Sequence, residues 1–304
     1  MTDTQNEVFK TPVNKIRLFE HGAPGSQNLK LTRKYYTEDM PDGRVKHIVQ
    51  NITDPDIVPY IPDGIGNSTD RQRIPAVLII PGGAFRRLVY NFEGEDVAKW
   101  LNSMGIAAFV LECRLPSDEH DNAEDVPLID AMRAMRVIRG RAQEFGIDEA
   151  KIGVMGFSAG GFMAALLSTA YESDVYADYK YKDEYDKLSA RPDFAVCSYP
   201  VISIDDCIEA GKRYMSEEQV LKRISDSKAK ILHKYNPDKL VRPDMPPVFI
   251  CETDDDRTTL SENSVGFYMA ARKAGVSAEL HIFRTGGHGY GLSLIHISEP
   301  TRPY

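Results

Sequence analysis

Ser158 lies in surroundings typical of a nucleophile. It is the central residue of Gly156-Phe157-Ser158-Ala159-Gly160, a Gly-x-Ser-x-Gly pattern between two apolar runs. Small residues on both sides allow a sharp strand-to-helix turn, from which the hydroxyl projects above a helix N-terminus. A serine held in this way can attack a carbonyl carbon when a general base takes its proton. Alone the pattern is weak, because it occurs by chance in about one chain of this length in ten.

His288 is the best candidate for that general base. It lies in the glycine-rich stretch at residues 286–291, directly after a predicted strand at residues 278–283. Imidazole exchanges its proton near neutral pH, which suits a base that must also act as an acid. His281 lies within the same predicted strand and is expected to be structural. A loop histidine is ordinarily incidental, but His288 follows a serine and an acidic run in a catalytic order.

That acidic run supplies the residue that could orient the histidine. Asp254, Asp255 and Asp256 follow a predicted buried strand at residues 246–251 and lie between Ser158 and His288 in the chain. Consecutive acidic residues usually lie in a solvent-exposed loop without a catalytic role. These acids follow a strand at the edge where Ser158 is also expected, so a carboxylate can hydrogen-bond the imidazole there.

A second glycine-rich loop follows the clearest predicted strand, at residues 76–80. The sequence there continues as Pro81-Gly82-Gly83-Ala84-Phe85. Small side chains let backbone N–H groups approach a ligand closely. Gly83 and Ala84 are therefore candidates to bind an oxyanion together with the N–H of Ala159. The alternative is a tight loop with no catalytic role.

Strand and helix patterns alternate along the chain. This alternation predicts an α/β fold with a mostly parallel central sheet and helices on both faces. Trp100 lies on the apolar face of a predicted helix at residues 97–104 and is expected in the core. The predicted strands cover residues 76–80, 106–111, 152–155, 194–198, 246–251 and 278–283, after two extended pieces at residues 28–36 and 47–60.

One catalytic domain is expected at residues 46–291, after a polar N-terminal arm at residues 1–45. Residues 200–241 form a charged, helical insertion that begins at the carboxyl edge of the sheet, so they are expected to form a lid that shapes substrate choice. The tyrosine-rich segment at residues 172–193 returns to the opposite edge. We expect it to be a solvated loop rather than a sugar-binding platform.

Composition argues against several classes of function. The net charge is −8 with a pI of about 5.5, and no basic stripe marks a nucleic-acid surface. The sequence has no apolar run long enough for a membrane span and no signal peptide, which predicts a cytoplasmic protein. The 4 cysteines lack Cys-x-x-Cys spacing, and no zinc or nucleotide motif is present, so no disulfide, metal or cofactor is expected. The oligomeric state stays open.

Together these stretches resemble α/β-hydrolase esterases of the carbohydrate acetyl-esterase type, described as acetyl-xylan-esterase-like. The resemblance covers about residues 46–291. It rests on IIPGGAF, EGEDVAKWLNSMGIAAFVLECRLP, DAMRAMRVIRGRAQEFGID, IGVMGFSAGG, RPDFAVCSYPVI, MPPVFICETDDD and GGHGYG.

The resemblance implies that Asp256, the last aspartate of the run, is the catalytic acid. The family usually continues with a hydrophobic-proline turn, whereas this chain has Arg257-Thr258-Thr259-Leu260, which leaves Asp255 as an alternative. Ala84 stands where the family tends to have a third glycine. Because alanine keeps its backbone N–H, the implied oxyanion role survives.

The implied activity is hydrolysis of short-chain esters, acetyl esters of small acylated saccharides above all, without a cofactor. Ser158 would attack the ester carbonyl, His288 would take its proton and Asp256 would orient His288. Phe85 and Phe157 are expected to narrow the acyl side of the site. A serine peptidase or amidase with the same triad, or a non-catalytic binding relative, is the alternative.

Residues 292–304, LSLIHISEPTRPY, are expected to be foreign to the natural protein. Leu292 to Arg302 resemble an in-frame translation of a transposase-type sequencing adapter, and the likeness to the esterases stops at Gly291. Such hydrolases continue there into a final helix that packs on the sheet. We therefore expect that helix to be missing and His288 to be held loosely, and we give His296 no functional weight. An ordinary strand is the alternative.

A chain whose natural C-terminus has been recovered by resequencing the source DNA should be more heat-stable than this chain and should hydrolyse esters faster. The restored helix would cover apolar surface and hold the histidine loop. Thermal unfolding and esterase assays of the two chains side by side test this. Equal stability and equal rate, or source DNA that encodes LSLIHISEPTRPY, would contradict it.

Overall fold

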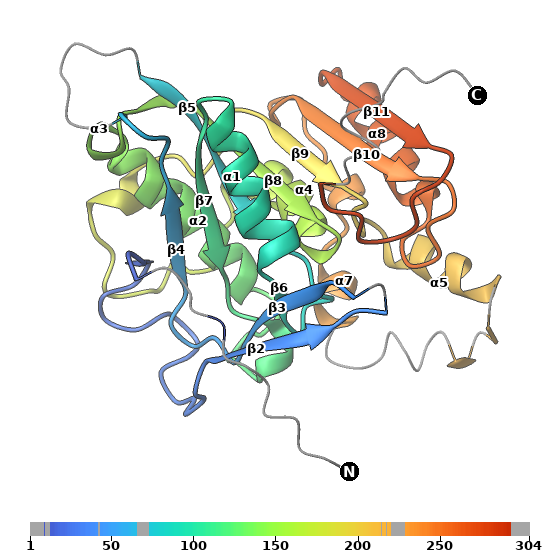
Figure 1. The fold of residues 1–304 in the computed structure, drawn as a ribbon, viewed down its shortest axis with the longest axis horizontal. Helices are drawn as coiled ribbons and strands as arrows, with labels where there is room; N and C mark the ends of the chain where they lie inside the picture. Colours follow the sequence, from blue (N-terminus) through green and yellow to red (C-terminus); the bar gives the residue numbers. More distant parts are fainter. Residues whose placement is uncertain are drawn as a thin grey trace.

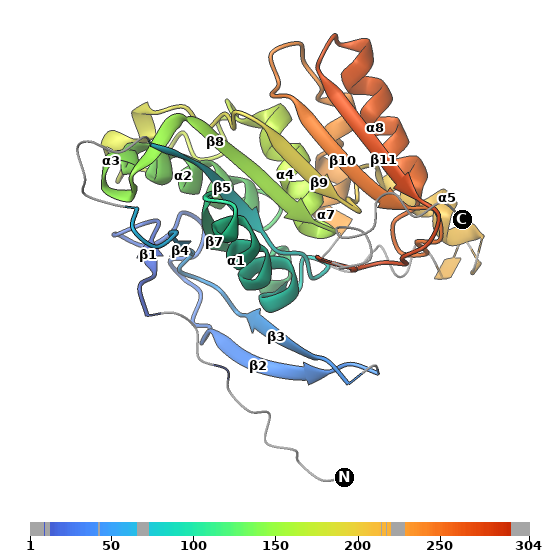
Figure 2. The same ribbon diagram turned by 45° about the horizontal axis from the view of Figure 1, so that its top comes forward.

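A mixed eight-stranded sheet forms the centre of the molecule, with helices on both faces (Figure 1). The computed structural model describes Phe9 and residues 13–41, 43–65, 73–213, 215–216, 218–219 and 229–292. The predicted tail therefore lies outside the described residues, apart from Leu292. Helix α1 covers one face of the sheet, and α2, α4 and α8 cover the other (Figure 1, Figure 2).

The elements follow the predicted alternation of strands and helices. The strands are β1 Ile16–Arg17, β2 Lys34–Asp39, β3 Val45–Gln50, β4 Asp56–Tyr60, β5 Ile74–Ile80, β6 Leu88–Val89, β7 Ala107–Glu112, β8 Ile147–Phe157, β9 Ala195–Ser198, β10 Val248–Thr253 and β11 Ala278–Phe283. The helices are α1 Asp96–Ser103, α2 Val126–Gly140, α3 Ala142–Phe145, α4 Ala159–Ala170, α5 Ile204–Lys212, α7 Ala229–Lys234 and α8 Ser261–Lys273.

The strand order explains which loops can meet. The main sheet runs β1-β4-β7-β5-β8-β9-β10-β11, and all strands from β7 to β11 in this order pair in parallel. The loops that leave the carboxyl ends of β5, β8, β10 and β11 therefore gather at one edge. The predicted mostly parallel sheet is confirmed.

The extended piece predicted at residues 47–60 is two strands in two different sheets. β3 joins a small antiparallel sheet in the order β2-β3-β6, whereas β4 pairs antiparallel with β7 in the main sheet. Asn51 follows β3 with a φ of 57°, the left-handed conformation that asparagine tolerates better than most residues. Figure 2 shows the β2–β3 hairpin beneath the main sheet.

The N-terminal arm is an integral part of the fold. β1 pairs with β4 at the sheet edge, and the boundary expected at residue 45 falls inside the β2–β3 hairpin. A buried ionic cluster holds the arm: the fully buried Glu112 carboxylate lies 2.6 Å from both Lys15 and Arg33. Removing both cations would leave the buried charge of Glu112 uncompensated.

The tyrosine-rich segment is packed more closely than a solvated loop would be. Tyr176 is only 7% exposed, and its hydroxyl donates to Asp186 at 2.8 Å. Arg133 of α2 pairs with Asp186 at 3.1 Å, which fixes the segment on this helix. Trp100, as predicted, packs partly buried against the core. Among the described residues, no helix has the length and apolarity needed to cross a membrane.

Candidate active site

Ser158 occupies the turn between β8 and α4. Its φ of 53° and ψ of −116° are unusual for a residue with a side chain, so local strain is held by the surrounding packing. A Cβ added at Gly156 would collide with the carbonyl oxygen of Gly160, and one at Gly160 would collide with that of Ile80. Both glycines are therefore required for a turn this tight.

The structure brings His288 to this serine. His288 lies in the loop after β11, and its Nε2 is 2.8 Å from the Ser158 Oγ. The edge of the Tyr199 ring packs against the imidazole, with centroids 5.1 Å apart and planes at 71°. The imidazole is therefore held from the side as well as by its ring nitrogens.

Asp256 lies on the other side of the imidazole. Its Oδ2 is 2.6 Å from His288 Nδ1, so a proton on Nδ1 leaves Nε2 free to accept the serine proton. Asp256 also accepts hydrogen bonds from the N–H groups of Thr258 and Thr259, at 2.7 and 3.0 Å. Burial opposes ionisation of this carboxyl, but the hydrogen bond and charge of His288 and the two amides outweigh it and lower the pKa of Asp256.

Asp255 has a different role. Its Oδ1 accepts from the N–H of Gly287 at 2.8 Å, and this hydrogen bond lowers the pKa of Asp255. Asp255 thus stabilises the loop that carries His288, whereas Asp256 contacts the imidazole itself. The threonines that stand in place of the family's hydrophobic-proline turn are the residues that hold Asp256.

The fully buried Glu252 lies at the end of β10, close to this aspartate in sequence. It accepts from the N–H of Thr253 at 2.9 Å and from the Ser264 hydroxyl at 3.3 Å. Burial raises the pKa of Glu252 to about 9. Burial and the nearby Asp256 thus disfavour a charge on Glu252, and it is Asp256 whose carboxylate contacts His288.

The glycine-rich loop after β5 lies beside Ser158. Gly83 and Ala84 line the same cavity as Ser158 and His288, and their φ angles are 135° and 59°. Ala84 thus adopts the left-handed conformation that a glycine would enter more easily. Ala159 begins α4 and is buried, at 4% exposed.

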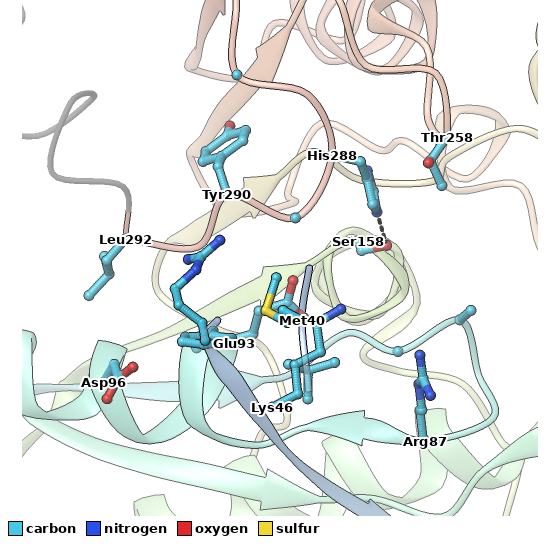
Figure 3. A pocket seen from close by; sticks show the side chains of 17 residues that line it. Met40, Lys46, Arg87, Glu93, Asp96, Ser158, Thr258, His288, Tyr290 and Leu292 are labelled. Carbon is cyan, nitrogen blue, oxygen red and sulfur yellow. Dashed lines mark hydrogen bonds between the residues drawn. The ribbon is translucent and has the colours of Figure 1, made fainter. Parts of the chain in front are cut away.

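The cavity has a volume of about 730 Å³ and opens at the carboxyl ends of the strands. Figure 3 shows Ser158 and His288 on one side, with Met40 and Lys46 facing them across the cavity. Its wall is made by Met40, Arg44, Lys46, Gly83, Ala84, Arg87, Val89, Phe92, Glu93, Asp96, Ser158, Thr258, Gly286, His288, Gly289, Tyr290 and Leu292.

The lid expected at residues 200–241 is not found in this wall. None of the described residues of that insertion lines the cavity, and Lys234 of α7 instead pairs with Asp125 at 2.7 Å. The β2–β3 hairpin takes that place and supplies Met40, Arg44 and Lys46. Antiparallel pairing of β2 with β3 brings this part of the predicted arm to the site, a contact that motif spacing does not reveal.

The two phenylalanines expected to narrow the acyl side lie in the core instead. The Phe85 ring packs edge-on against Phe162, with centroids 5.5 Å apart, and Phe157 packs against Tyr199 at 5.9 Å. Neither lines the cavity that contains Ser158. Burial of the rings is more favourable than exposure at the rim, so that expectation was wrong.

Comparison with known proteins places the chain in a family. Residues 65–270 match the model of the family described as BD-FAE. The chain belongs to the BD-FAE family. This BD-FAE protein has the fold of the α/β-hydrolases, as the resemblance of its motifs had implied.

Two curated relatives match more than two thirds of this BD-FAE protein. An acetylxylan esterase of Xylanibacter ruminicola is 31% identical over 71% of this chain and 41% of its own length. Endo-1,4-beta-xylanase B of Butyrivibrio fibrisolvens is 31% identical over 72% of this chain and 33% of its own length. The chain thus spans less than half the length of either relative.

Solved structures extend the comparison over most of the BD-FAE chain. The acetyl ester-xyloside bifunctional hydrolase from Caldicellulosiruptor lactoaceticus is 34% identical with a TM-score of 0.67, covering 94% of this chain and 91% of that one. The carboxylesterase Cest-2923 from Lactobacillus plantarum has a TM-score of 0.62 at 22% identity, covering 86% of each chain, and supports the fold alone.

The two aspartates can be separated by matched substitutions. Asp256→Asn should lower kcat for an aryl acetate by about 10³–10⁴-fold, because an amide no longer holds the imidazole in the required tautomer. Asp255→Asn should cost about tenfold or less, since it only weakens a bond to the Gly287 amide. Steady-state kinetics of both purified variants provide the measurement, and the reverse ranking would assign the acid to Asp255.

Proposed function

We propose that the protein hydrolyses short-chain carboxylic esters, acetyl esters of small acylated saccharides above all, through a Ser-His-Asp acyl-enzyme mechanism. The observation that carries the proposal is the continuous chain of contacts from Ser158 through His288 to Asp256. Its two distances, 2.8 and 2.6 Å, are those of hydrogen bonds ready for proton transfer.

The geometry supports a two-step acyl transfer. As Ser158 Oγ attacks the ester carbonyl, His288 Nε2 takes its proton and Asp256 stabilises the resulting imidazolium. His288 then gives the proton to the departing alcohol. In the second step the same nitrogen takes a proton from water, which attacks the acyl-enzyme, and then returns the proton to Ser158 Oγ as the bond to the acyl group breaks and the acid leaves.

Backbone N–H groups would stabilise the charge that develops on the carbonyl oxygen. Gly83 and Ala84 lie in the cavity wall beside Ser158, and Ala159 follows Ser158 at the start of α4. Donors fixed by the backbone need no reorganisation during reaction, which is why such sites accelerate acyl transfer strongly. The N-terminus of α4 adds a favourable dipole.

The saccharide part of the proposal rests on the relatives and on the size of the cavity. One of the two curated relatives at 31% identity is an acetylxylan esterase. The structural neighbour at 34% identity is an acetyl ester-xyloside bifunctional hydrolase. A cavity of about 730 Å³ is far larger than an acetyl group and leaves room for a sugar on the alcohol side. The cytoplasmic location stays a prediction from sequence.

Substitution of the nucleophile and the base tests the mechanism. Ser158→Ala and His288→Ala should each remove nearly all hydrolysis of an aryl acetate while the protein stays folded, because triad residues act as one unit. A fluorophosphonate probe should label the unsubstituted protein and not Ser158→Ala. Ordinary turnover by Ser158→Ala would refute the mechanism. If the unsubstituted protein cleaved peptide amides faster than aryl acetates, it would be a peptidase. If it cleaved neither substrate, it would be a binding protein. Because a relative at 31% identity is an acetylxylan esterase, acetate esters should be hydrolysed faster than octanoate esters.

Alcohol preference should depend on the hairpin rather than on the insertion. Lys46→Ala should raise KM for an acetylated xylo-oligosaccharide by about five- to tenfold through loss of one polar contact, and should leave phenyl acetate nearly unchanged. Lys239→Ala, in the insertion and paired with Asp205 at 3.4 Å, is the matched control and should alter neither substrate. If Lys239→Ala raised this KM more than Lys46→Ala does, the insertion rather than the hairpin would determine the preference for the alcohol part.

A further inference from the structure

A largely buried carboxylate in the cavity wall, beside the oxyanion loop, has no part in the chemistry described above. Glu93 lies in a π-helical turn, Asn91–Glu95, just before α1, and is 5% exposed. Its Oε2 accepts a hydrogen bond from the N–H of Gly82 at 2.8 Å. A Cβ added at Gly82 would lie 2.5 Å from the Phe157 carbonyl oxygen, 2.6 Å from this oxygen and 3.0 Å from the Ser158 Cβ, so no side chain fits at Gly82.

The second oxygen of Glu93 binds a tyrosine that reaches the opposite loop. The Tyr199 hydroxyl donates to Glu93 Oε1 at 2.9 Å and accepts from the N–H of Gly291 at 3.1 Å. Gly291 belongs to the loop that carries His288. One carboxylate therefore connects the oxyanion loop and the histidine loop through a single phenol group.

Tyr199 also contacts the other residues of the site. It follows β9, is fully buried and has a φ of 38°, a conformation that is strained for a tyrosine. Its ring edge packs on the His288 imidazole, with centroids 5.1 Å apart. Its carbonyl oxygen accepts from the Thr259 hydroxyl at 3.3 Å, and Thr259 in turn holds Asp256.

We propose that Glu93 and Tyr199 are positioning residues that align the oxyanion-binding amides with the serine and histidine. Glu93 fixes Gly82, the residue before Gly83 and Ala84, while Tyr199 ties the same carboxylate to the histidine loop. This inference rests on the proposed function. Neither residue is a catalytic residue in itself, since each acts through the groups that it holds.

The cost of burying this carboxylate favours a role in catalysis. Burial raises the pKa of Glu93, against the hydrogen bonds from Tyr199 and Gly82, so this acid lies in surroundings that disfavour its charge. A polar side chain that served only packing could be replaced by a neutral one at lower cost. Misplacement of preorganised amides by about 1 Å can cost about 10²-fold in rate, which is the scale of benefit available.

Glu93→Leu and Tyr199→Phe test the proposal in the full chain. Tyr199→Phe keeps the ring and removes the hydroxyl, and Glu93→Leu removes both carboxylate oxygens at similar size, so each variant breaks the link between the two loops. For an aryl acetate we expect kcat to fall about 10- to 100-fold with KM within about twofold, because amide alignment matters most in the transition state. In the double variant kcat should fall no further than in the more strongly affected single variant, since both substitutions break the same Glu93–Tyr199 connection.

Tyr176→Phe is the matched control, because it removes another buried tyrosine hydroxyl from a carboxylate, Asp186, and neither residue lines the cavity. It should lower the midpoint of thermal unfolding about as much as Tyr199→Phe does and leave kcat unchanged. Circular dichroism of every variant ensures that rates are compared between folded proteins.

The possible outcomes separate this inference from the proposed function. If the unsubstituted protein hydrolyses the acetate, Ser158→Ala does not, and the folded Tyr199→Phe keeps full kcat, the positioning role is wrong although the mechanism stands. The positioning role is also wrong if the fall in kcat is fully explained by the fraction of the variant that is unfolded. Equal hydrolysis by Ser158→Ala instead refutes the mechanism itself.

Discussion

Close contact between the first turn of α4 and the ends of β5 and β8 is the constraint on which the rest of the site depends. Only glycine fits at Gly156 and Gly160, because any side chain there would strike a backbone carbonyl. The backbone at Ser158 is thereby forced into a strained conformation that projects its hydroxyl from the sheet edge. Packing of the buried, apolar α4 holds this strain in place.

Parallel pairing then determines which loops can reach that hydroxyl. β10 lies between β9 and β11, so the loops carrying Asp256 and His288 leave neighbouring strands at the same edge as Ser158. Hydrogen bonds fix their separation: the Thr253 hydroxyl donates to the Gly287 carbonyl at 2.9 Å, and Asp255 accepts from the Gly287 amide. Loops supported in this way can keep hydrogen-bonding groups within the narrow tolerances of catalysis.

The sequence predicted the sheet and the residues around Ser158 because these depend on local signals. Apolar runs and glycine-rich turns locate strands and their ends, and chain order then places Asp256 and His288 at one edge. The contact between Asp256 and His288 rests on donors from Thr258 and Thr259, which a departure from the family pattern had left in doubt. Their catalytic roles stay predictions until they are tested.

Contacts between distant segments could not be predicted in the same way. Antiparallel pairing carries the β2–β3 hairpin to the cavity, although its polar sequence resembles a loose arm. Glu93 and Tyr199 meet across more than 100 residues, and neither belongs to a recognisable spacing. The direction of the Phe85 and Phe157 rings likewise depends on the neighbours that surround them in the core.

The central claim is that acyl transfer passes through Ser158. Acid quenching within milliseconds of mixing with an activated acetate ester, followed by peptide mass mapping, measures this intermediate directly. The account predicts one added acetyl group on the peptide that contains Ser158, appearing during turnover and disappearing as substrate is consumed. Turnover with no acetylated Ser158 at any quench time, or with the acetyl group on another residue, would contradict it.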